Sequence, residues 1–326
     1  MKKNRWSYCA LAISMAICTV FMGCSSKKNL SEKIELNLGS FKEKTDDGYK
    51  YINIDKDEKI ENARDILAGN LESGTYIYTL DSKLYVRSED DEYEIQEDNM
   101  YSYSMSPAGK YLFYFTKGEY LTPKIKELSN NSISDLKNKA YISGEFVGWL
   151  GDEKLAYYGV DMETKAAGIY VYDVSSEKEE LLYQINEGFI TYIKSFGDSV
   201  IFLIKDFQGN SKLMKLMENG DAFEISTEVE EISDIEVTNQ GIFLLGKTKN
   251  NVYSLYKFND HTASRLVYDF PLNLSLEKGL SKDEIGDILF MGSNAGTASE
   301  KIYKYNNGAV SIAYDKEGQY EFITIN

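Results

Sequence analysis

The chain has 326 residues, of which 52 are acidic and 36 are Lys or Arg, so its formal net charge is −16 at neutral pH. This acidity argues against nucleic acid as a partner, because nucleic-acid-binding proteins neutralise phosphates with Lys and Arg. It also argues against adsorption to anionic lipid headgroups, so membrane attachment would have to come from another source.

The first 24 residues have the pattern of an export signal. Lys2, Lys3 and Arg5 precede an apolar stretch over residues 9–21, which is too short to span a bilayer. The segment at its end, Phe21-Met22-Gly23-Cys24, resembles the lipobox of bacterial lipoproteins. The resemblance implies that residues 1–23 are a signal peptide, that Cys24 carries a lipid with palmitate-type acyl chains, and that the mature protein is held extracytoplasmically at the outer face of the membrane. The alternatives are an ordinary signal peptide or a membrane-anchored helix.

Cysteine usage follows from this assignment. Cys9 and Cys18 would leave with the signal, and the lipid would occupy Cys24. The mature chain then has no thiol for a disulfide or a Cys-based metal site, and we expect no metal and no cofactor. The preference for lysine over arginine is typical of AT-rich genomes and favours a Gram-positive source.

A polar segment separates the signal from the rest of the chain. Residues 24–58 predict a lipidated, flexible tether, and residues 59–326 predict the folded domain. Residues 49–54 have the composition of a first strand, whereas residues 60–67 are compatible with a short helix or an irregular edge.

From Gly74 onward the pattern is all-β. Short runs of β-branched and aromatic residues are interrupted by Asp, Asn and Gly every 8–12 residues. Similar strand pairs begin near residues 101, 145, 190 and 232, and each is followed by two further strands. Four antiparallel strands in a repeat of about 40–45 residues are typical of a β-propeller blade.

One segment carries a recognisable blade motif. Residues 105–114 read MSPAGKYLFY, and residues 148–157 are a weaker copy. This phrase resembles the S-P-D-G-K turn of TolB-like propellers and of the WD-like propellers of the prolyl oligopeptidase family, with Ala108 in place of the usual aspartate. The resemblance implies a propeller fold. The glycine of the motif has a turn role, because it supplies a positive φ between two strands.

The strand pattern predicts a single propeller of six four-stranded blades. The expected blades span residues 74–96, 101–136, 145–184, 190–226, 232–269 and 272–314, with an insertion and a short helix over residues 276–285. The first has only three strands, so we expect the C-terminal strand at residues 320–325 to complete it and close the ring. Seven blades are the alternative, if residues 30–66 fold into a blade.

The sequence offers no catalytic constellation. His261 is the only histidine, it lies in a predicted hairpin, and no α/β-hydrolase domain follows the propeller. Acidic residues are too numerous for any pair to be singled out. We therefore assign no catalytic residue, while paired channel carboxylates of a carbohydrate-active hydrolase or lyase remain the alternative.

The leading hypothesis is a non-enzymatic, membrane-anchored surface lipoprotein whose propeller binds a protein, a peptide or a cell-wall glycan. Functional residues concentrate on loops over rigid scaffolds. The loops between second and third strands, and those between blades, are longer or richer in glycine than the opposite turns. From these loops we select a set of candidate partner-binding residues: Tyr120, Asp161, Glu163, Phe207 and Asn294.

Overall fold

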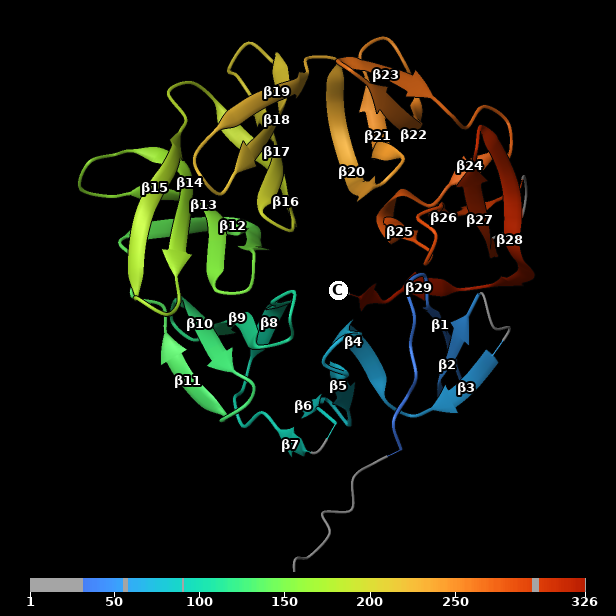
Figure 1. Cartoon of the computed structure of the whole chain (residues 1–326), viewed down its shortest axis with the longest axis horizontal. Helices are drawn as coiled ribbons and strands as arrows, with labels where there is room; N and C mark the ends of the chain where they lie inside the picture. The colour runs from blue at the N-terminus through green and yellow to red at the C-terminus, as the bar shows by residue number, and fades with distance from the viewer. Residues whose placement is uncertain (1–31, 55–57, 90, 295–298, 326) are drawn as a thin grey trace, which may run out of the picture. The chain divides into compact units, whose positions relative to one another are not determined.

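The computed structural model describes residues 32–54, 58–89, 91–294 and 299–325, and within them the chain forms β-strands and one short 3₁₀ helix. From Ile34 onward these residues form one compact unit. Its strands assemble into seven separate sheets arranged around a central axis (Figure 1). The unit is therefore a seven-bladed β-propeller. The prediction of six blades is wrong, and the seven-blade alternative is the one observed.

Four of the blades follow the simple order of four consecutive antiparallel strands expected from the repeat. Blade 3 contains β8 (Met100–Met105), β9 (Tyr111–Lys117), β10 (Leu121–Glu127) and β11 (Ser132–Asp135). Blade 4 contains β12 (Ala140–Leu150), β13 (Lys154–Asp161), β14 (Ala167–Asp173) and β15 (Lys178–Gln184). Blade 5 contains β16 (Phe189–Phe196), β17 (Ser199–Lys205), β18 (Ser211–Met217) and β19 (Ala222–Ser226). Blade 6 contains β20 (Val229–Thr238), β21 (Gly241–Thr248), β22 (Tyr253–Asn259) and β23 (Thr262–Arg265).

The remaining three blades are less regular. Blade 1 contains β29 (Tyr320–Phe322), β1 (Phe41–Thr45), β2 (Gly48–Asn53) and β3 (Glu58–Asn62). Blade 2 contains β30 (Thr324–Ile325), β4 (Asp65–Asn70), β5 (Thr75–Leu80), β6 (Lys83–Arg87) and β7 (Glu92–Glu94). Blade 7 contains β24 (Asn273–Leu274), β25 (Leu280–Lys282), β26 (Ile288–Ser293), β27 (Glu300–Asn306) and β28 (Ala309–Gly318), with η1 (Leu276–Lys278) before β25.

Blade 1 is the blade that the six-blade prediction left out. Much of it falls in the segment expected to be a tether, yet Phe41, Tyr51 and Ile52 are fully buried. The helix considered for residues 60–67 is absent. Ile66 and Ala68 are buried and Asp65 is not, which is the alternation of a strand, and these residues belong to β4.

The C-terminal strand does not complete the blade at residues 74–96, because β4 already occupies the inner position beside β5. Tyr320, Glu321 and Phe322 pair instead with Glu43, Lys42 and Phe41 of β1. Blade 1 is therefore built from two segments far apart in the sequence.

The turn motif at residues 105–114 is explained by its hydrogen bonds. The Ser106 hydroxyl accepts bonds from the backbone N–H groups of Lys110 (3.1 Å) and Tyr111 (3.0 Å). Gly109 has φ +68°, and a Cβ there would lie 2.8 Å from the Ser73 hydroxyl of blade 2. The Asp152 carboxylate, from the equivalent turn of blade 4, accepts a bond from the Ala108 N–H (2.7 Å). The motif thus fixes a tight turn and connects it to its neighbours.

The hydrophobic core is divided into seven layers, each lying between two adjacent blades. Tyr51, Tyr114, Tyr157 and Tyr256 are among the largest side chains that are completely buried in them. Many of the 26 tyrosines therefore act as packing residues, as aromatic side chains do between sheets.

The tyrosine-rich core predicts a loss of stability at alkaline pH. Burial, with a hydrogen bond to Asp65 in the case of Tyr49, raises the pKa values of Tyr49 and Tyr93 to about 12. Burial raises the pKa of Tyr157 further, with help from its hydrogen bond to Glu179. The folded state therefore keeps protons that the unfolded state releases near pH 10, so stability is unaffected below that pH and falls as the pH rises above it. Urea unfolding from pH 7 to pH 11, followed together with tyrosinate absorbance, tests this. A free energy of unfolding that stays constant up to pH 11 would contradict it.

Candidate functional site

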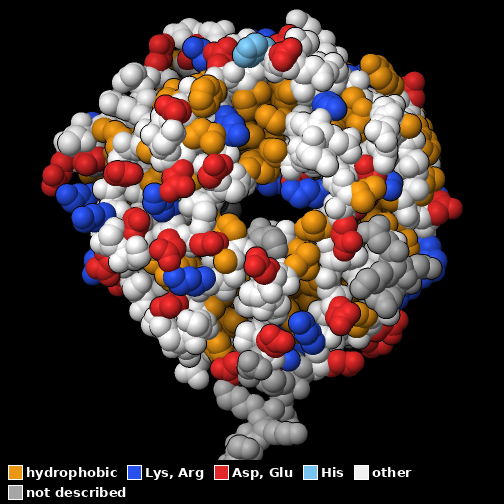
Figure 2. Space-filling view, viewed as in Figure 1, with side chains coloured by type: hydrophobic (Ala, Val, Ile, Leu, Met, Phe, Trp, Pro, Cys, Tyr) orange, Lys and Arg blue, Asp and Glu red, His pale blue; other side chains and the backbone are white. Residues whose placement is uncertain are grey.

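The inner strands of the seven blades surround a central channel. A cavity of about 760 Å³ is lined by residues from every blade. Figure 2 shows the opening in the middle of the ring, with basic side chains on its border. The channel is the one place in the described chain where all seven blades meet.

The inner strands are not regular. In β4, β8, β12, β16 and β20 the register against the neighbouring strand shifts, as it does at a β-bulge. In β20 one shift lies between Ile232 and Asp234. Because a bulge redirects the side chains beyond it, such shifts decide which residues point into the channel.

The channel has two chemically different walls. One is largely apolar and comes from blades 2, 3 and 4, with the residues Leu67, Ala68, Tyr103, Met105, Val147 and Trp149. The other is polar and comes from blades 5, 6 and 7, with the residues Lys194, Asp234, Glu236, Lys278 and Lys282. An apolar surface facing a few fixed polar groups is the usual composition of a ligand cavity.

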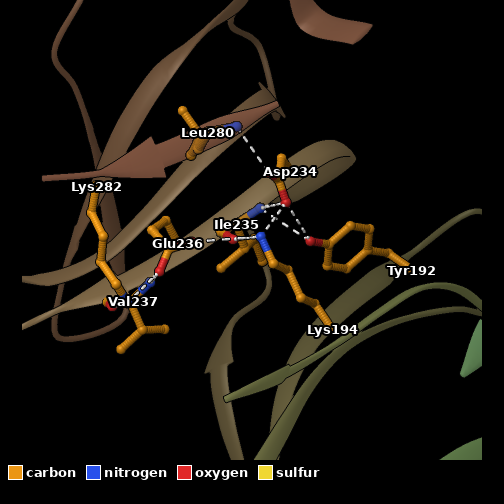
Figure 3. A network of polar contacts seen from close by, with 8 residues as sticks. All are labelled: Tyr192, Lys194, Asp234, Ile235, Glu236, Val237, Leu280 and Lys282. Carbon is orange, nitrogen blue, oxygen red and sulfur yellow. Dashed lines mark hydrogen bonds and ion pairs between the residues drawn. The ribbon is translucent and has the colours of Figure 1, made fainter. Parts of the chain in front are cut away.

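Asp234 is the centre of the polar wall (Figure 3). Its Oδ1 accepts hydrogen bonds from the Tyr192 hydroxyl (3.0 Å) and from Lys194 Nζ (2.8 Å), both on β16. Its Oδ2 accepts the backbone N–H of Leu280 on β25 (2.8 Å). One carboxylate on blade 6 therefore connects blades 5, 6 and 7. Its side chain is only 16% exposed.

Glu236, two residues further along β20, repeats this arrangement. Lys282 Nζ donates to Glu236 Oε1 (2.8 Å) and to the Val237 carbonyl (3.2 Å). Lys194 Nζ lies 3.6 Å from Glu236 Oε2 and donates to the Ile235 carbonyl (2.8 Å). The two carboxylates thus share Lys194, and each also has a contact with blade 7.

The electrostatics of this network keep both lysine and tyrosine protonated. Burial lowers the pKa of Lys194, but the charges of Asp234 and Glu236 outweigh this and raise it above its usual value. Burial, together with the charge of Asp234, raises the pKa of Tyr192 well above its ordinary value. At neutral pH the network therefore consists of an ammonium group and a phenol held by carboxylates, which is an arrangement suited to structural connection.

The same device occurs between blades 1 and 2. Lys42 on β1 binds the Asp65 carboxylate and the Ile66 carbonyl (3.1 Å) on β4. In all three cases a lysine binds a carboxylate and the carbonyl of the next residue in the adjoining blade. We call these contacts the lysine bridges: Lys42 to Asp65, Lys194 to Asp234 and Lys282 to Glu236.

The residues selected from the sequence lie elsewhere, on loops of blades 3, 4, 5 and 7. Tyr120 and Phe207 are 75% and 76% exposed. The Asp161 carboxylate accepts the backbone N–H groups of Glu163 (2.8 Å) and Thr164 (2.9 Å), which lower its pKa, so Asp161 shapes its own loop. Glu163 is exposed, and Asn294 lies in the loop that follows β26. Asp161 and Glu163 share one loop, while the other three lie on separate blades.

These loops nevertheless share one end of the ring. In the described blades the first residues of the inner strand pair with the last residues of the second strand, as Phe189 does with Lys205. The connections between blades and the loops between second and third strands therefore lie at one end, which we call the connection face. The opposite end carries the tight turns and is called the turn face.

Exposed aromatic side chains are concentrated on the connection face. Among the described residues, eight large aromatic side chains are at least 42% exposed. Seven of them lie in or beside its loops: Tyr120, Tyr141, Phe189, Phe207, Tyr253, Tyr268 and Phe270. The eighth, Phe223 at 55% exposure, begins β19 on the turn face. The sequence analysis selected two of the seven, Tyr120 and Phe207. Tyr141, Phe189 and Tyr253 lie at strand ends, and Tyr268 and Phe270 lie in the connection after β23, which was not among the loops considered.

Other predicted features are placed as follows. His261 is exposed in the hairpin between β22 and β23, and its Nδ1 lies 3.0 Å from the Ile225 carbonyl. The described part of the chain contains no group of three or more His, Cys, Asp or Glu residues able to hold a metal. It also has no helix long and apolar enough to cross a membrane. Cys24 and the signal segment lie outside the described residues.

No family model and no curated protein matches this sequence. Solved structures do match its fold. An uncharacterised protein from Listeria monocytogenes has a TM-score of 0.57 and 9% identity, over 90% of this chain and 92% of that one. An oligogalacturonate lyase from Vibrio parahaemolyticus has a TM-score of 0.56 and 12% identity, over 87% and 86%.

The β-propeller domain of the trilobed protease from Pyrococcus furiosus has a TM-score of 0.51 and 13% identity, over 78% of this chain and 86% of that one. TolB from Acinetobacter baumannii also matches, but its TM-score of 0.45 is too low to carry an argument. At these identities the matches support the propeller fold alone.

The lysine bridges predict a stability effect. Replacing Lys194 by Met leaves Asp234 and Glu236 without their shared cation, so their negative charges repel each other. The free energy of unfolding should fall by about 1–3 kcal/mol, less than for a fully buried pair because a third of the Lys194 side chain is exposed. Lys212→Met, at an exposed position of the neighbouring strand β18, is the matched control. Urea denaturation measures both, and equal losses in the two variants would show that the bridge contributes nothing.

Proposed function

We propose that this protein is a non-enzymatic binding protein, anchored to the outer face of the cell membrane through a lipid on Cys24, whose connection face captures a protein, a peptide or a cell-wall glycan. The observation that carries the proposal is the concentration of seven exposed aromatic side chains on that face. Surface aromatics in such number are costly to solubility unless they contact something.

The chemistry of the connection face supports this kind of partner. Tyr and Phe rings provide large contact areas with few rotatable bonds, and they pack equally well on apolar side chains and on the faces of sugar rings. The face is also supported by rigid sheets, so ordering it on binding costs little. Two of its rings, Phe189 and Phe207, already contact each other with centroids 6.4 Å apart.

The proposal predicts a face-specific loss of binding. The double variant Tyr120→Ala, Phe207→Ala should reduce capture of the partner from detergent-solubilised membranes or cell-wall fragments about tenfold or more, as loss of interface aromatics does. Its thermal stability should be nearly unchanged, because both side chains are largely in solvent.

Phe223→Ala provides the control, since it removes an exposed aromatic ring from the turn face. Capture should be measured by cross-linking and quantitative mass spectrometry against the unaltered protein. Equal capture by the double variant, or an equal loss in the Phe223 control, would contradict the assignment of this face.

The anchor is tested separately. Cys24→Ala removes the thiol that would accept the lipid, so labelling with a radioactive or clickable fatty acid should disappear and the precursor should remain uncleaved. A Ser25→Ala variant keeps the thiol and should be labelled normally. Continued lipid labelling and membrane attachment of the Cys24 variant would disprove the lipoprotein assignment.

The alternative function is a carbohydrate-active hydrolase or lyase. Its support is the presence of Asp234 and Glu236 on the channel wall and the fold likeness to an oligogalacturonate lyase. Against it, both carboxylates belong to one strand and are already occupied by lysines and backbone donors. Turnover of oligogalacturonate that is abolished by Asp234→Asn, in a variant that still folds, would favour the enzyme over the binding protein.

A further inference from the structure

The segment that follows β29 crosses from blade 1 to blade 2 along the channel. The Ile323 N–H donates to the Ser40 carbonyl beside blade 1 (3.2 Å). Thr324 and Ile325 then form β30, which pairs with Ala68 and Gly69 of β4. Among the strand pairs of the described residues, this is the one that is parallel. Figure 1 shows this end of the chain near the centre of the ring.

The pairing of β30 is short and rests on the inner edge of a sheet. β4 is the innermost strand of the antiparallel blade, so its inward edge presents backbone groups that can pair with an added strand. β30 uses this edge at two residues only. A parallel pair is slightly less stable per residue than an antiparallel one, so β30 is held weakly compared with β29.

The side chains around β30 alternate in a way that fits an extended peptide. Ile323 is 4% exposed and packs in the layer between blades 1 and 2, where Ile325 also packs. Thr324, between them, is exposed. The edge of β4 therefore offers backbone hydrogen bonds together with apolar contacts for every second residue. This combination is the basis of peptide recognition by strand addition.

Space for a longer peptide adjoins the edge. The channel cavity is lined by Leu67 and Ala68 of β4, by Thr324 and Ile325, and by Tyr103 on the neighbouring blade. A peptide seated on β4 would lie against the apolar wall and opposite the lysine bridges of Lys194 and Lys282.

We propose that the inner edge of β4 is a binding groove for an extended peptide with β-branched apolar residues at alternate positions, and that Thr324–Ile325 occupies this groove as an internal competitor. A peptide from a partner would displace β30 and pair with β4, while β29 remains in blade 1. This site is distinct from the connection face and does not rest on the function proposed for it.

The test compares two chains with one probe. The first chain is the mature protein, and the second ends at Ile323, which removes β30 and leaves β29 and Ile323 in place. The probe is a fluorescein-labelled peptide, Lys-Thr-Ile-Thr-Ile-Lys, which repeats the alternation of residues 323–325 and is kept soluble by its lysines. Fluorescence anisotropy should show at least tenfold tighter binding to the shortened chain, because the internal competitor is absent. The peptide Lys-Thr-Pro-Thr-Pro-Lys lacks two backbone N–H donors and should not bind.

A second variant controls for misfolding of the shortened chain. Ile325→Ser keeps the chain length but removes the apolar anchor of β30, so its affinity for the probe should lie between those of the other two chains. Circular dichroism and thermal melting verify that each chain is folded. Equal affinity for the full and shortened chains, or no binding to either the shortened chain or the Ile325 variant, overturns the proposal.

Two further outcomes identify what occupies the groove. Dimerisation of the shortened chain in size-exclusion chromatography, without peptide binding, would mean that a second copy covers the edge, and it overturns the peptide assignment. The Tyr120→Ala, Phe207→Ala variant should bind the probe with unchanged affinity, which separates this site from the connection face.

Discussion

The packing of one blade against the next is the interaction on which the rest of this structure depends. A four-stranded sheet has two faces to bury, and no blade contains enough of its own residues to cover either one. Each of the seven apolar layers is therefore shared by two blades, and the layer formed by Phe41, Ile52, Leu289, Met291 and Tyr320 joins the last blade to the first. The ring is complete only when all seven layers are present.

The lysine bridges also hold adjacent blades together, through ion pairs and hydrogen bonds. At three places an inner-strand carboxylate and the carbonyl of the next residue both lie within reach of a lysine from the adjoining blade. A lysine is long enough to satisfy one of these carbonyls and the carboxylate beside it at the same time, as Lys194 does with Ile235 and Asp234. Two of these contacts, those of Lys194 and Lys282, place compensated charge on the channel wall, so that this wall can be polar without unpaired ions.

The sequence was sufficient for an all-β propeller and for most strands, because alternation is a local property, but the predicted number of six blades was wrong. Blades 3 to 6 have strong periods of two and clear turns, and their boundaries were predicted within a few residues. Blade 1 entered only as the seven-blade alternative, since its strands are polar on one face and its fourth strand comes from residues 320–322. The partner of a strand can lie far away in the sequence, as β29 does from β1, and a local pattern does not identify it. The joining of the first and last blades depends on this pairing.

The candidate site, too, could be predicted from the sequence only in part. Loop residues such as Tyr120 and Phe207 could be selected from the strand pattern, because exposure follows from loop position. The network around Asp234 could not, since a lone acidic residue between Ile232 and Ile235 looks like ordinary solvated charge. A register shift in β20 brings Asp234 beside Tyr192 and Lys194. The local sequence does not indicate such a register shift.

Because blade 1 combines two distant segments of the chain, the order of synthesis affects when this blade can fold. Its strands β1 to β3 are synthesised before all the strands of blades 3 to 7, whereas their inner partner β29 is synthesised after them. Until then the edge of β1 and the apolar side chains of Phe41 and Ile52 have no cover. This order postpones completion of blade 1 until blades 3 to 7 have been synthesised, and joining two segments so far apart in the sequence costs loop-closure entropy and slows folding.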